Sequence, residues 1–131
     1  MSAYILDASV AVAAFTEPGG DAAAVLADPA RTFAVPSIFD VEVISALRGL
    51  VRGGKCDGAA AQELIVDVMA LPVERWHLHP LLPRMWQLRD NLTPYDAAYV
   101  ALAEMTGSTL LTGDERITAA PGVRCQIEIL K

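Results

Sequence analysis

The chain has 131 residues, and we expect residues 1–131 to form a single domain. Hydrophobic residues make up 53% of it and charged residues 20%, a composition that excludes a disordered chain. The net charge of −6 argues against nucleic-acid binding through a basic surface, unless bound cations reverse the local sign. The 2 cysteines exclude a disulfide scaffold, and with no visible signal or membrane-spanning run the expected location is cytoplasmic.

Hydrophobic periodicity and turn residues predict the elements in chain order. They are a strand at 3–6, helices at 7–15 and 21–27, a strand at 32–35, helices at 38–52 and 57–70, a strand at 73–78, helices at 81–90 and 93–105, and strands at 109–112 and 123–129. Ser37, with Asp40, is expected to cap the third helix, and Thr93 the sixth. Alternating strands and helices predict an α/β fold with a mostly parallel central sheet covered by helices on both faces.

Four carboxylates lie at the edges of these hydrophobic segments: Asp7, Glu42, Asp96 and Asp114. Asp7 and Asp114 each follow a predicted strand, and the carboxyl ends of parallel strands meet at the edge of a sheet where ligands bind. Each acid also has a structural interpretation, as a helix cap, a dipole partner or a turn residue. Carboxylates gathered in one cleft repel each other unless protons or a hard cation lie between them, so together they predict a divalent metal site.

The segments that carry these acids are similar to those of a known family. ILDAS at 5–9, Glu42 on a helix, TPYDAAYVALAE at 93–104 and LLTGDERI at 110–117 resemble the PIN-domain ribonucleases and, in size and pattern, the VapC toxins. The resemblance implies a PIN-like three-layer sandwich. It also implies that the four acids bind Mg²⁺, for which Mn²⁺ can substitute, and are the catalytic residues. Ser9 and Thr112 match supporting polar positions of that family.

The resemblance further implies a function. It predicts a Mg²⁺-dependent endoribonuclease, the toxin of a VapBC-type toxin-antitoxin system, in which Asp96 or Glu42 orients or deprotonates the attacking water. The expected partners are RNA and a cognate VapB-like antitoxin, whose helix would bind the hydrophobic faces of 38–52 and 58–70. A homodimer, and a heterotetramer or larger complex with the antitoxin, are expected.

Other residues receive weaker interpretations, and other functions stay open. Arg48, Arg52 and Arg116 are candidate contacts to RNA phosphates, although they also fit a solvated surface, while Trp86 is expected to pack rather than to stack on bases. A dehalogenase-type phosphatase would need a second acid where this chain has Ser9, and a nucleotide-binding module would need a glycine-rich turn after the first strand. The remaining alternative is a catalytically inactive PIN-like protein-interaction module.

Overall fold

The computed structural model describes residues 2–130, in which five parallel strands form one sheet. The strands are β1 (Ser2–Leu6), β2 (Arg31–Pro36), β3 (Val73–Trp76), β4 (Thr109–Thr112) and β5 (Ile127–Ile129), and their order across the sheet is β3-β2-β1-β4-β5. The first strand is therefore central, and the connections run to one side of it and then to the other. Such a change of direction leaves a crevice at the carboxyl ends of the two central strands, β1 and β4.

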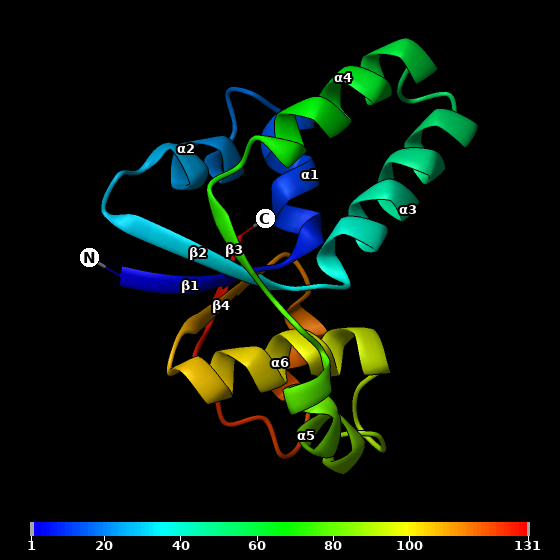
Figure 1. The fold of residues 1–131 in the computed structure, drawn as a ribbon. Helices are drawn as coiled ribbons and strands as arrows, with labels where there is room; N and C mark the ends of the chain where they lie inside the picture. The colour runs from blue at the N-terminus through cyan, green and yellow to red at the C-terminus, as the bar shows by residue number, and fades with distance from the viewer. Residues whose placement is uncertain (1, 131) are drawn as a thin grey trace.

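Helices cover both faces of the sheet, which confirms the predicted three-layer arrangement. They are α1 (Ala8–Thr16), α2 (Asp21–Ala27), α3 (Phe39–Arg52), α4 (Gly58–Met69), α5 (Leu82–Gln87) and α6 (Pro94–Thr106), with 3₁₀ turns η1 (His79–Leu81) and η2 (Glu115–Ala119). Helices α1 to α4 lie on one face and α5 and α6 on the other, and α3 and α4 form a hairpin that projects beyond the sheet (Figure 1). Within residues 2–130 no single helix has the length and hydrophobicity to cross a bilayer, although α1 and α2, bent by 104°, pass that test as a pair.

The core lies where α1 and α6 pack on the central strands. Ile5 and Leu6 of β1 and Leu110 and Leu111 of β4 are fully buried, as expected for parallel strands covered on both faces. Residues 97–103 of α6 are each 2% exposed or less, because their many small side chains let the helix lie close to the sheet. This packing fixes the N-terminal turn of α6 at the carboxyl edge of the sheet.

The start of α3 differs from the prediction. Ser37 does not cap the helix, which begins at Phe39 after Ile38 without a side-chain cap. The Ser37 amide instead donates to the carbonyl of Trp76 (2.9 Å), extending the pairing of β2 with β3. Asp40 accepts two hydrogen bonds of 2.9 Å from the Arg75 guanidinium of β3 rather than capping α3. Pairing between strands therefore replaces the predicted local cap.

Three further predictions near the C-terminal half were wrong in extent or environment. The helix predicted at 81–90 ends at Gln87, and the strand predicted at 123–129 contains only Ile127–Ile129. The Arg124 amide donates to the Glu104 carboxylate (2.8 Å), so it does not join the strand pairing. Trp86 is 67% exposed rather than packed, and the Arg89 guanidinium lies 4.4 Å from its ring centre.

Candidate active site

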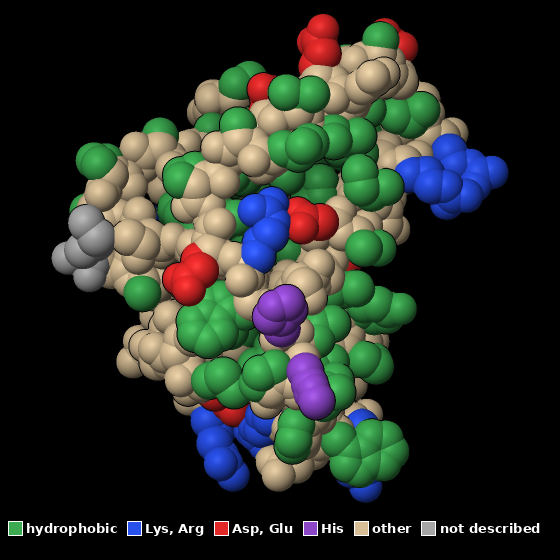
Figure 2. All heavy atoms as spheres, in the orientation of Figure 1, with side chains coloured by type: hydrophobic (Ala, Val, Ile, Leu, Met, Phe, Trp, Pro, Cys, Tyr) green, Lys and Arg blue, Asp and Glu red, His purple; other side chains and the backbone are tan. Residues whose placement is uncertain are grey.

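The four predicted carboxylates line one cleft of about 600 Å³ at the carboxyl edge of the sheet. They come from four separate segments: the end of β1, the first turns of α3, the first turn of α6, and the turn after β4. Ala8, Ser9, Ser45, Ala46, Gly113 and Arg116 complete the lining. The small side chains leave open space in front of the acids, and Figure 2 shows the surface hollowed between α3 and the start of α6. The spacing in the sequence thus predicted the convergence correctly.

Asp7 is held in place from two directions. Its Oδ1 accepts a hydrogen bond from the Ser9 amide (3.4 Å), so Asp7 caps α1. Its Oδ2 accepts one from the hydroxyl of Thr112 (2.6 Å), a residue that is 0% exposed. The same hydroxyl accepts from the Asp114 amide (3.1 Å), and Ser9 Oγ accepts from the Gly113 amide (3.4 Å). The two predicted supporting residues, Ser9 and Thr112, therefore join α1 to the turn after β4.

Glu42 and Asp96 share a crowded, partly desolvated environment. Burial raises the pKa of Glu42 above its usual range, and the negative charges of Asp7 and Asp96 raise it further. Burial is also the main reason why the pKa of Asp96 is raised, followed by the charges of Asp7 and Asp114. The Thr93 hydroxyl and the positive charge of Arg116 partly oppose this rise in the pKa of Asp96. The same hydroxyl accepts a hydrogen bond from the Asp96 amide (3.2 Å) and so caps α6, as predicted. The acids are thus close enough to repel each other.

Asp114 has a different environment, because it is paired with a cation. Arg116 donates from Nε to Oδ1 (3.0 Å) and from Nη2 to Oδ2 (2.8 Å), while its backbone amide also donates to Oδ1 (3.0 Å). These bonds hold the pKa of Asp114 below its usual range. In the described part of the chain no ion pair involves Asp7, Glu42 or Asp96.

The donors at this cleft fit a hard divalent cation in chemistry. Carboxylate oxygens are the preferred ligands of Mg²⁺ and Mn²⁺, and Oε1 of Glu42 is buried without a hydrogen-bond partner. As placed, however, no group of three or more Asp, Glu, His or Cys side chains among residues 2–130 is arranged to hold a metal ion. Binding would therefore need side-chain rotation, and Arg116 would have to release Asp114 for that residue to take part.

Two features of the site were absent from the sequence interpretation. Tyr99 is 1% exposed, and its hydroxyl lies beside Glu42. It follows Asp96 by three residues on α6, a spacing that places two side chains on one helix face and would have identified it. The pairing of Arg116 with Asp114 was the second. Arg48 and Arg52 line a groove between α3 and α4 instead of the cleft, so of the three candidate phosphate contacts only Arg116 lies beside the acids.

Comparison with known proteins assigns the fold. Residues 4–123 match the PIN domain family. Ribonuclease VapC12 of Mycobacterium tuberculosis is 38% identical over 126 residues, covering 96% of this chain and 98% of that protein. The chain belongs to the PIN-domain family. Ribonuclease VapC9 of the same organism is 34% identical, with 96% and 97% covered.

Solved structures share the fold of this PIN domain at lower identity. VapBC2 from Rickettsia felis, bound to a DNA fragment from its promoter, matches with a TM-score of 0.71 and 16% identity, covering 98% of this chain and 99% of that one. VapC20 of M. tuberculosis, described as a toxin that cleaves the sarcin-ricin loop, matches with a TM-score of 0.67 and 17% identity, covering 92% and 96%. At these identities the matches support the fold alone.

Proposed function

We propose that this PIN domain is a metal-dependent endoribonuclease and the toxin of a VapBC-type pair. One observation carries the proposal: carboxylates from four distant segments line a single cleft, and a buried Glu42 oxygen there has no hydrogen-bond partner. Repulsion among these acids is best relieved by a divalent cation. The family membership and the names of the relatives, ribonucleases VapC12 and VapC9, support RNA as the substrate.

In this proposal Asp7, Glu42 and Asp96 hold Mg²⁺ or Mn²⁺, and Asp114 joins them when Arg116 turns away. The cation, when bound, supplies positive charge for the phosphate and lowers the pKa of a water. Thr112 keeps Asp7 in a fixed orientation through its hydrogen bond of 2.6 Å. Arg116, 90% exposed at the side chain, is free to turn toward a phosphate of the RNA.

Glu42 or Asp96 orients the attacking water or accepts its proton. The water oxygen bonds to phosphorus as the bond from phosphorus to O3′ breaks. The electron pair leaves with O3′, which takes up a proton from solvent, and the carboxyl group later releases its proton to solvent. The products are a 3′-hydroxyl on the upstream fragment and a 5′-phosphate on the downstream fragment.

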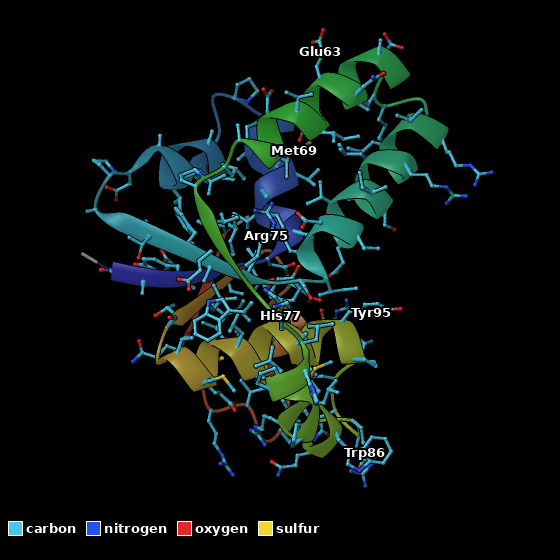
Figure 3. All side chains as sticks on the ribbon, viewed as in Figure 1. Glu63, Met69, Arg75, His77, Trp86 and Tyr95 are labelled. Carbon is cyan, nitrogen blue, oxygen red and sulfur yellow. The ribbon has the colours of Figure 1, made fainter. Side chains whose placement is uncertain are left out.

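Cleavage of cellular RNA by the purified protein tests this function. We expect discrete fragments with Mg²⁺ or Mn²⁺, none with EDTA, and at least about a hundredfold loss of rate in Asp7→Asn. Glu63→Gln is the matched control, since it neutralises an exposed carboxylate of α4 far from the cleft lining (Figure 3). Cleavage that persists in EDTA or in Asp7→Asn refutes the metal mechanism. An intact, metal-binding protein that leaves all RNA uncut but binds an antitoxin supports the inactive interaction module.

The hydrophobic surface of the α3–α4 hairpin supports an antitoxin partner. A groove of about 700 Å³ runs between the two helices, and hydrophobic side chains gather over them on the face shown in Figure 2. Ile44 and Val51 in this groove are 46% and 36% exposed. Because an amphipathic helix buries such side chains, Ile44→Asp should abolish co-purification with a co-expressed VapB-type antitoxin while Mn²⁺ binding is retained. Unchanged co-purification would place the antitoxin elsewhere.

A further inference from the structure

Tyr99 is buried next to the acidic cleft, although it is not one of the residues that line it. It lies on α6, three residues after Asp96, and it is 1% exposed. Its hydroxyl is close to the carboxylates of Glu42 and Asp7 and to the backbone amide of Ala8, the first residue of α1. Tyr99 therefore reaches the segments that carry three of the four acids.

Neither the Tyr99 hydroxyl nor Oε1 of Glu42 makes a hydrogen bond of good geometry, although the hydroxyl lies close enough to Glu42 to lower the pKa of that carboxyl. Among residues 2–130, the buried side-chain polar atoms without a hydrogen-bond partner are Glu42 Oε1, Tyr99 Oη and Trp76 Nε1. Two of these three lie side by side at the candidate site. Buried polar groups in native proteins are almost always paired. An unpaired donor next to an unpaired acceptor therefore indicates that the two atoms become paired when the site binds its cation.

The chemistry of the two groups is complementary. A carboxylate only accepts hydrogen bonds, whereas a phenol can donate one. A tyrosine hydroxyl, whose usual pKa is about 10, keeps its proton at neutral pH. When the Glu42 side chain turns to bind the ion, the two atoms can form a hydrogen bond. Metal-binding side chains are commonly oriented by such an outer partner, which reduces the freedom that is lost when the ion binds.

We propose that Tyr99 is a positioning residue, whose hydroxyl donates to Glu42 and fixes the orientation in which that carboxylate binds the divalent cation. This inference rests on the proposed metal site. It assigns a role in that site to a side chain that does not itself bind the ion. In the metal-free fold the hydroxyl has no hydrogen bond of good geometry, so it adds little to stability there.

The test is Tyr99→Phe, which removes only the hydroxyl. Mn²⁺ affinity, measured by electron paramagnetic resonance of the free ion, should fall about tenfold. The melting temperature of the metal-free protein should stay the same or rise, because an unsatisfied buried group is removed. Tyr95→Phe is the matched control: its hydroxyl belongs to the same helix but projects outward at 56% exposure, and the variant should match wild type (Figure 3).

A double-mutant cycle shows whether Tyr99 acts through Glu42. In a Glu42→Gln background the effect of Tyr99→Phe on Mn²⁺ affinity should disappear, whereas independent contributions would multiply. Wild-type affinity in Tyr99→Phe, a matching loss of metal-free stability, or multiplicative effects in the cycle would each overturn the positioning role. If wild type itself fails to bind Mn²⁺, the proposed function falls as well, so the two failures are distinguishable.

Discussion

Thr112→Val is the sharpest test of how the site is held together. Valine has nearly the shape of threonine, so the change removes the hydroxyl and leaves the packing at this fully buried position almost intact. Two hydrogen bonds are lost: the one donated to Asp7 (2.6 Å) and the one accepted from the Asp114 amide (3.1 Å). The variant therefore separates hydrogen bonding from packing.

The magnitude follows from the types of bond. A bond to a charged carboxylate contributes about 2 kcal/mol and a neutral bond about 1 kcal/mol, so the free energy of unfolding should fall by about 3 kcal/mol. For 131 residues the unfolding entropy is roughly 0.28 kcal/mol/K, which converts this loss to about 11 °C in melting temperature. Mn²⁺ affinity should also fall, by about tenfold, because Asp7 loses the donor that orients it.

Differential scanning calorimetry and Mn²⁺ titration measure the two effects, and Thr112→Ser is the control. Serine keeps the hydroxyl but loses one buried methyl group, which costs about 1 kcal/mol, so its affinity for Mn²⁺ should stay near that of wild type. If Thr112→Val has the same melting temperature and the same Mn²⁺ affinity as wild type, the two hydrogen bonds do not hold the site together. If both variants lose affinity equally, packing rather than the hydroxyl is responsible.

Three further predictions concern charges. Because the folded-state pKa of Glu42 is raised, this residue costs no stability while it is protonated at low pH and becomes destabilising as the pH rises. Glu42→Gln should therefore raise the melting temperature of the metal-free protein more at pH 7.5 than at about pH 4.5. An equal gain at both pH values would contradict this prediction. Arg116→Ala should free Asp114 and so strengthen Mn²⁺ binding. It should also reduce by about 1 the slope of the logarithm of the RNA-binding constant against the logarithm of salt concentration. An unchanged slope would place Arg116 away from RNA. Arg84 donates to both carboxylate oxygens of Glu104 (2.7 and 3.2 Å), so Arg84→Ala should cost about 2 kcal/mol in chemical denaturation without changing Mn²⁺ affinity, which a loss of binding would disprove.

The sequence was sufficient for the features that depend on short-range pattern. Thr93 caps α6 as predicted, because a cap involves residues three positions apart. Asp7 and Asp114 were placed correctly since each directly follows a hydrophobic strand, and parallel strands bring such positions to one edge. Glu42 was placed beside the cleft by the small residues that follow it one turn later, Ser45 and Ala46.

Tertiary structure decided the features that depend on residues far apart in the chain. Ser37 and Asp40 carry a capping pattern, but strand pairing and Arg75, 35 residues away from Asp40, use those groups instead. The Tyr99 hydroxyl lies close to Glu42 only because α6 and α3, from opposite faces of the sheet, both begin at its carboxyl edge. A local sequence pattern predicts which side chains share a helix face or a strand end. Hydrogen-bond partners, and the burial that raises a pKa, depend on which distant segments of the chain pack against those side chains. For this PIN domain, the sequence alone therefore determined the fold and the set of acids, and folding decided which neighbours orient them.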